Sequence, residues 1–120
     1  MFSYPTSKFS TSRGFTYNYI HISPTAPNQE YLLFLHGFPS SAHDYHHQIS
    51  HFSEKGYGIV VPDMLGYGET SKPLDVNAYT GKGIAQDISE ILENEKIEKV
   101  IGVGHDWYIT RYKNSRGKRI

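Results

Sequence analysis

Apolar and polar residues alternate around a Ser-Arg-Gly turn in the early segment KFSTSRGFTYNYIHI. Such alternation is typical of a strand with one buried face, because successive side chains point to opposite sides. The apolar face of the second strand carries Phe15, Tyr17 and Tyr19. Its other face carries Thr16, Asn18 and Ile20. The pattern predicts an antiparallel hairpin near the N-terminus.

Three short apolar runs follow, with the sequences YLLFLH, YGIVVPD and KVIGVG. A continuous apolar run of this length is typical of a strand that is buried on both faces. Between the last two runs, a helix is predicted from Tyr79 to Glu95, because an apolar stripe recurs at helical spacing through Ile84, Ile88, Ile91 and Leu92. A second helix is predicted after GFPSSAHDY, with Ser40 or Ser41 as its N-cap. This alternation predicts an α/β fold whose mostly parallel sheet is flanked by helices.

The 120 residues suffice for one domain and leave no room for two. The chain has no cysteine, which excludes a disulfide framework, a thiolate metal site and a cysteine nucleophile. It shows no apolar stretch typical of a secretory signal and no apolar run near the ~20 residues of a membrane span. We therefore expect a cytosolic protein without a membrane partner.

The formal net charge is zero, but the charges are unevenly distributed. Residues 1–107 carry 7 basic and 12 acidic side chains, whereas residues 108–120 carry 5 basic and no acidic ones. One interpretation is a basic arm that binds nucleic acid or anionic lipid. We favour the other interpretation, in which the tail is foreign to the domain before it, and we expect no nucleic-acid partner.

The segment GVGHDW holds the strongest candidate for chemistry. A buried strand ends at Val103, and a small residue stands two positions before Asp106, as in the tight strand-to-helix turn called a nucleophile elbow. A carboxylate on such a turn can attack an electrophilic carbon and form an ester that water then cleaves. Taken alone, the segment favours a helix-capping role for Asp106.

A second segment, LFLHGFPSS, favours a catalytic role for Asp106 over helix capping. It places His-Gly-x-Pro directly after the first buried strand, where α/β-hydrolases supply one oxyanion-hole amide. The segment VPDMLGYGETSKP follows the second buried strand. With these three motifs in this order, residues 8–107 resemble the α/β-hydrolase family and, within it, the epoxide hydrolases.

The resemblance implies that Asp106 attacks an epoxide carbon while the backbone N–H groups of Phe38 and Trp107 form the oxyanion hole. It implies two lid tyrosines that protonate the leaving oxygen, and a histidine, oriented by a second acid, that activates water. Support for the two loops is expected from His36, Gly37, Pro39 and His105. The implied substrate is a small-molecule epoxide or a similar electrophile, and no cofactor is implied.

Two alternatives stay open. Haloalkane dehalogenases also use an Asp nucleophile, often beside a Trp, but usually have Asn where this chain has Phe38. A non-catalytic fragment that binds a ligand or a full-length relative is the alternative from another class.

Several other polar residues have structural interpretations. We expect no metal site, because no acidic residue completes a ligand set on the helix face that His43, His47 and His51 would share. Asp63 is interpreted as a brace for the loop after the second buried strand, and Tyr67 in that loop as a packing or pocket residue. A solvated helix face is predicted for Asp87, Glu90, Glu93, Glu95 and Glu98.

The chain departs from the family after Trp107. Tyr108 stands where the elbow needs a small residue, and no His follows His105, although the fold places its catalytic His downstream of the nucleophile. We therefore divide the chain into the N-terminal part of an α/β-hydrolase domain, residues 1–107, and a disordered basic tail, residues 108–120. Out-of-frame or intronic translation would account for this tail. We expect an incomplete fold without turnover that self-associates through the free edge of its last strand.

Overall fold

The alternating N-terminal segment forms the expected hairpin in the computed structural model, which describes residues 4–25, 29–35, 45–98 and 100–104. Strand β1, Thr6–Ser10, pairs antiparallel with strand β2, Thr16–Ile22. The turn between them is closed by the N–H of Gly14, which donates to the carbonyl of Thr11 over 2.9 Å. Gly14 has a φ of 89°, a left-handed conformation that glycine adopts without steric cost.

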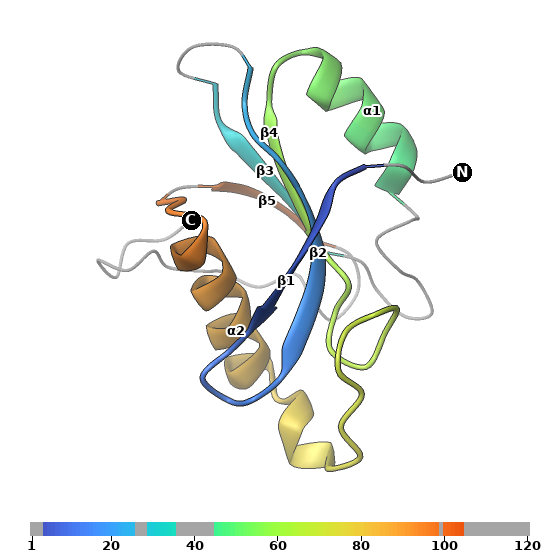
Figure 1. Ribbon diagram of the computed structural model, residues 1–120, viewed down its shortest axis with the longest axis vertical. Coiled ribbons are helices and arrows are strands. Elements are labelled where there is room, and N and C mark those ends of the chain that lie inside the picture. The colour runs from blue at the N-terminus through green and yellow to red at the C-terminus, as the bar shows by residue number, and fades with distance from the viewer. Residues whose placement is uncertain (1–3, 26–28, 36–44, 99, 105–120) are drawn as a thin grey trace.

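The three apolar runs form three adjacent strands of a five-stranded sheet (Figure 1). These strands are β3, Tyr31–Leu35, β4, Gly58–Pro62, and β5, Val100–Gly104. The strand order is β1-β2-β4-β3-β5, with β3 parallel to both β4 and β5. Because β2 is antiparallel to both its neighbours, it alone runs against the other four strands. The prediction of a mostly parallel sheet with an N-terminal antiparallel hairpin is confirmed.

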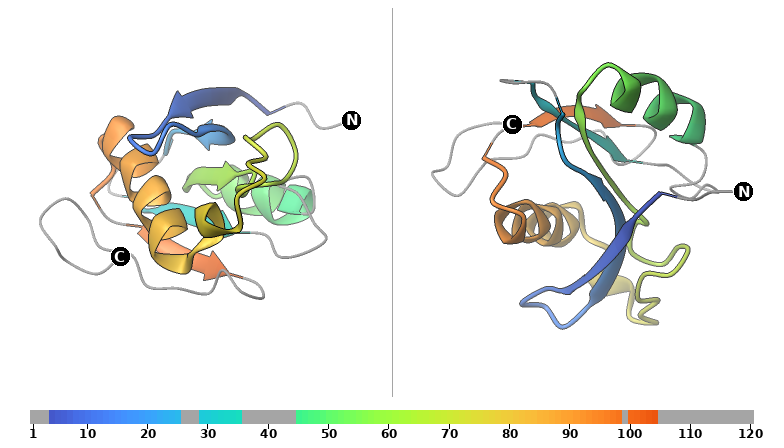
Figure 2. Two further views of the ribbon diagram at one scale, coloured as in Figure 1. Left: turned by 90° about the horizontal axis from the view of Figure 1, so that it is seen from below. Right: turned by 45° about the horizontal axis from the view of Figure 1, so that its top comes forward.

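Two helices cover opposite faces of this sheet (Figure 2). Helix α2, Gly81–Asn94, buries its predicted isoleucine stripe against one face, where it meets Tyr17, Leu33 and Val60. Helix α1, His46–Glu54, packs Ile49 against the other face. Adjacent β3 residues alternate between the two cores, as side chains of a doubly covered strand must.

The helix starts differ from the sequence predictions. Helix α2 begins at Gly81, because Thr80 is its N-cap and the Thr80 hydroxyl accepts the N–H of Gly83 over 3.1 Å. The preceding residues form a short 3-10 helix, η2, Val76–Tyr79. The predicted N-caps Ser40 and Ser41 lie outside the described residues, and the N-cap of the described helix α1 is Tyr45.

The predicted solvated face of α2 is wrong for Asp87, whose exposed fraction is 0 %. Its carboxylate accepts hydrogen bonds from Arg13 Nε at 3.0 Å, from Arg13 Nη2 at 2.7 Å and from the Tyr17 hydroxyl at 2.7 Å. Burial, aided by the bond to Asp87, raises the pKa of Tyr17, so this phenol stays a donor. Nearby, Glu90 accepts the backbone N–H and the hydroxyl of Ser12. The hairpin turn is thus anchored to α2 by residues far apart in sequence.

We predict that Arg13→Ala lowers the free energy of unfolding by about 3 kcal/mol, because it leaves the buried Asp87 carboxylate without its cation. Urea denaturation followed by circular dichroism measures the change. Lys82→Ala is the matched control: it removes an exposed cation from helix α2, which carries Asp87, and should change stability by less than about 0.5 kcal/mol. Equal effects of the two substitutions would contradict the anchoring role of Arg13.

Candidate active site

The parallel pairing of β3 with β5 sets the geometry of the candidate site (Figure 1). The last residues of the two strands, Leu35 and Gly104, are Cα partners. Each therefore lies at the carboxyl edge of the sheet, where open α/β sheets bind their ligands. The two predicted catalytic segments, 36–39 and 105–107, therefore follow directly from two neighbouring strand ends.

All of the sequence-predicted site residues themselves lie outside the described residues. They are His36, Gly37, Phe38, Pro39, His105, Asp106 and Trp107. Their roles as nucleophile, oxyanion donors and loop support stay predictions.

The start of α1 is tied to the end of β3. The Tyr45 hydroxyl donates to the carbonyl oxygen of Leu35 over 2.7 Å. The Tyr45 ring also packs against Phe34, with ring centroids 5.0 Å apart. The hydrogen bond connects Leu35 and Tyr45, the two described residues that flank segment 36–44, which carries the predicted oxyanion loop.

At the end of the neighbouring strand β4, Asp63 braces the loop that follows, which confirms the structural interpretation of this residue. Its carboxylate accepts the N–H of Glu69 over 3.1 Å, and its carbonyl accepts the Thr70 hydroxyl over 2.6 Å. Gly68 approaches so closely that an added Cβ would lie 2.4 Å from the Asp63 carboxylate. Tyr67 is partly buried and packs on the core. The loop beside the candidate site is therefore held by its own contacts.

A second polar cluster, which the sequence did not reveal, lies near the first residue of β3, at the other edge of the sheet. His21 Nδ1 lies 3.3 Å from the Glu95 carboxylate, and His21 Nε2 lies 2.9 Å from the Tyr31 hydroxyl. Tyr19 also donates to Glu95. Burial and this bond raise the pKa of Tyr19 to about 12. Because Tyr31 begins β3 and Leu35 ends it, this cluster is not part of the candidate site.

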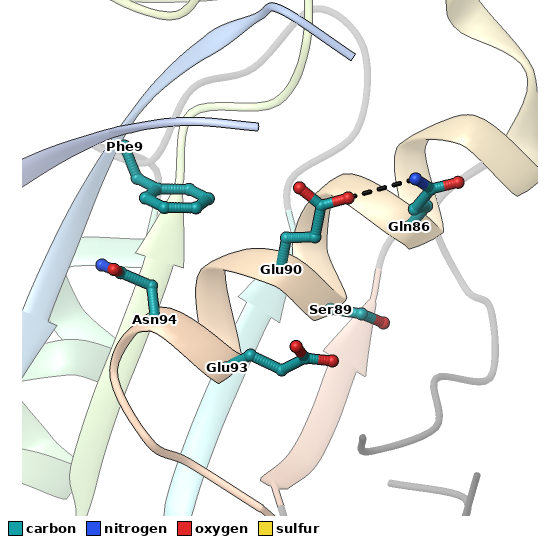
Figure 3. A pocket seen from close by; sticks show the side chains of 6 residues that line it. All are labelled: Phe9, Gln86, Ser89, Glu90, Glu93 and Asn94. Atoms are coloured by element: carbon teal, nitrogen blue, oxygen red, sulfur yellow. Dashed lines mark hydrogen bonds between the residues drawn. The ribbon is translucent and has the colours of Figure 1, made fainter. Parts of the chain in front are cut away.

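A pocket of about 620 Å³ opens between Phe9 of β1 and helix α2, also away from the candidate site (Figure 3). It is lined by Phe9, Gln86, Ser89, Glu90, Glu93 and Asn94. Glu90 is already bonded to Ser12 and, over 3.1 Å, to the Gln86 amide. Glu90 and Gln86, which also reaches Ser12, are therefore engaged in anchoring the hairpin turn.

The described part of the chain contains no cluster of three or more His, Cys, Asp or Glu side chains that could hold a metal ion. His47 and His51 are exposed on α1, whereas His43 lies outside the described residues. None of the described helices combines the length and apolar character needed to cross a membrane.

Comparison with known protein families shows to which family this chain belongs. The family model described as the alpha/beta hydrolase fold matches residues 30–107, which include β3, α1, β4, α2 and β5. The chain belongs to the α/β-hydrolase family. The motifs that suggested this family lie in or directly beside the matched region.

Curated relatives of this chain are named epoxide hydrolases. Epoxide hydrolase 3 of Siraitia grosvenorii is 42% identical over 76 residues, which cover 63% of this chain and 24% of the relative. Epoxide hydrolase A of Mycobacterium tuberculosis is 35% identical over 81 residues, covering 68% of this chain and 25% of the relative. The chain thus spans about a quarter of the length of these relatives.

Solved structures give the same result for the hydrolase fold. An epoxide hydrolase from Vigna radiata superposes with a TM-score of 0.77 at 30% identity, covering 86% of this chain and 31% of that one. A structure titled as novel epoxide hydrolases from metagenomes of hot environments reaches a TM-score of 0.80 at 34% identity, covering 89% of this chain and 35% of that one. The sheet and helices described above are the part of the fold that is shared.

Proposed function

We propose that this hydrolase is the N-terminal part of an enzyme that opens epoxides to diols through an ester on Asp106. The observation that carries the proposal is the pairing of Leu35 with Gly104, because it starts both motif-bearing segments side by side at the carboxyl edge of the sheet. The epoxide hydrolase relatives support the choice of substrate class.

The proposed reaction has two steps. An Asp106 carboxylate oxygen attacks an epoxide carbon, the carbon–oxygen bond of the epoxide breaks, and its oxygen takes a proton from an acid of the lid. The product is a hydroxyalkyl ester of Asp106. Water then attacks the ester carbonyl, and the bond between the carbonyl carbon and the ester oxygen breaks. The diol leaves with one proton of the water, the oxygen of the water stays in the Asp106 carboxylate, and the second proton is released.

The backbone N–H groups of Phe38 and Trp107 are the proposed oxyanion hole for the second step. Two such donors stabilise the negative charge that develops on the ester carbonyl oxygen. We assign loop support around them to His36, Gly37, Pro39 and His105. Asp63 takes no part in the proposed reaction, since its carboxylate already holds the neighbouring loop.

The two steps place different demands on a polypeptide of these 120 residues. Ester formation needs Asp106, and acid assistance typically contributes about 10²–10⁴-fold, so this step would be slow but feasible without the lid. Ester cleavage needs a base to activate water, and no His follows Asp106 in these residues. We therefore propose that this polypeptide alone does not turn over.

We further propose that residues 108–120 lie outside the hydrolase domain, which is supported by the end of the family match at residue 107. The cytosolic location expected from the sequence stays a prediction.

Self-association is proposed through β5, which lies at one end of the described strand order. Its second residue, Ile101, is 45% exposed. An uncovered apolar edge strand offers unpaired backbone groups to another copy of the chain.

We predict a molar mass that rises with protein concentration in sedimentation velocity, and we predict that Ile101→Lys reduces this rise, because a charged edge opposes strand pairing. Val76→Lys is the control, since Val76 is 80% exposed but lies outside the sheet. A monodisperse monomer at all concentrations would refute association through β5.

The activity proposal predicts a covalent adduct on Asp106 after incubation with styrene oxide, and no sustained formation of diol. Intact-mass and peptide mass spectrometry detect the adduct, and chromatography measures the diol. Asp106→Asn should abolish the adduct, because an amide is a poor nucleophile. Continuous diol formation by the native chain, lost in Asp106→Asn, would show that these 120 residues need neither the lid nor a downstream His.

A further inference from the structure

We propose that His47 and His51 form a surface site for a divalent transition-metal ion, which takes no part in the proposed reaction. Both residues belong to helix α1, His46–Glu54, and both are exposed. They are four positions apart, so they lie one turn from each other on the same side of the helix, with about 5–6 Å between their Cβ atoms. Two imidazoles at this spacing can bind one ion together.

The packing of α1 against the sheet directs this side of the helix towards solvent. Ile49 follows His47 by two residues, which is about 200° around the helix axis. Its side chain is fully buried, in the core that α1 shares with one face of the sheet (Figure 1). Because Ile49 holds the opposite side of the helix, an ion can reach His47 and His51 without any change in the fold.

The imidazole nitrogens of both residues are available to a ligand. The His47 ring lies 4.0 Å from the His46 ring, and the His51 ring 4.9 Å from the Phe52 ring, measured between centroids. Within the described part of the chain, neither His47 nor His51 enters a hydrogen bond or an ion pair. Side chains in a helix lean towards its N-terminus, so the His51 ring can reach the turn that carries His47.

The donor atoms decide which ions this site takes. Imidazole nitrogen suits Zn²⁺, Ni²⁺ and Cu²⁺, and Cu²⁺ binds most tightly in this series, whereas Mg²⁺ prefers oxygen ligands. The expectation of no metal site referred to a ligand set that includes an acidic residue. A chelate of two imidazoles, with water in the remaining positions, needs neither an acidic ligand nor a cluster of three protein ligands.

The first test is calorimetric titration of the native chain and its variants with Cu²⁺ at neutral pH. His47→Gln and His51→Gln should each weaken binding at least about tenfold, because each removes the second, intramolecular ligand of the chelate. The double variant should bind no more than about twofold more weakly than either single variant, since the two losses are coupled.

His46→Gln is the matched control. His46 is also exposed on α1, but it is about 100° around the helix from His47, so its loss should leave the affinity unchanged. The proposal is overturned by the absence of saturable binding, by binding that neither substitution weakens, by an equal loss in His46→Gln, or by equally tight binding of Mg²⁺.

The second test asks whether binding depends on the helix. The two imidazoles are neighbours only while α1 is formed, so the ion should stabilise α1 by mass action. Hydrogen exchange in peptides from residues 46–54 should slow by up to about tenfold when free Cu²⁺ is about ten times its dissociation constant. His51→Gln should remove this effect. Exchange that Cu²⁺ does not slow in the native chain, slowing that persists in His51→Gln, or an affinity unchanged in denaturing urea would each contradict a site built by α1.

Discussion

The fold depends on the burial of β3 between two parallel neighbours and under two helices. Four of its five residues are buried, and they alternate between the core under α2 and the core under α1. Leu33 and Leu35 face one core, and Leu32 and Phe34 the other. A slip of the strand by one residue would exchange these faces, so packing specifies the register strongly. The same register makes Leu35 the partner of Gly104.

This constraint explains how a small framework can place a reactive site. Function in α/β folds resides in loops at the carboxyl edge, and rigid strands decide where those loops start. On this edge, Tyr45 holds the end of β3 and Asp63 holds the loop after β4. Neither residue needs to touch a substrate to matter, because each fixes the backbone beside the proposed site. The chemistry itself is assigned to segments 36–39 and 105–107.

Local sequence patterns predicted the strands and helices well, because the periodic spacing of apolar residues in each is visible within a few neighbouring residues. The hairpin, β3, β4, β5 and the body of α2 were all expected. The position of β5 at the sheet edge followed from the family resemblance rather than from periodicity. The start of α1 at His46 was not predicted, because its N-cap Tyr45 is an aromatic residue without the side-chain signal of Ser or Asp.

Contacts between distant residues could not be predicted in this way. Asp87 occupies a helical position among charged residues, and its burial depends on Arg13, 74 positions away. Glu95 meets His21 and Tyr19 for the same non-local reason. For the candidate site, the motifs could be recognised in the sequence. The pairing of Leu35 with Gly104, which brings the two strand ends together, was known only from the sheet of the structure.

The register of β3 and β5 is the central claim, and disulfide trapping tests it directly in a chain that has no cysteine of its own. In the double variant Leu35→Cys and Gly104→Cys, the two cysteines should form a disulfide under mild oxidation, because directly paired residues of neighbouring strands lie within bridging distance. The pair Leu35→Cys and Gly102→Cys is two residues out of register and should stay reduced, since its Cα atoms would be more than about 7 Å apart. Efficient trapping of the second pair and not the first would show that the two site segments do not start side by side.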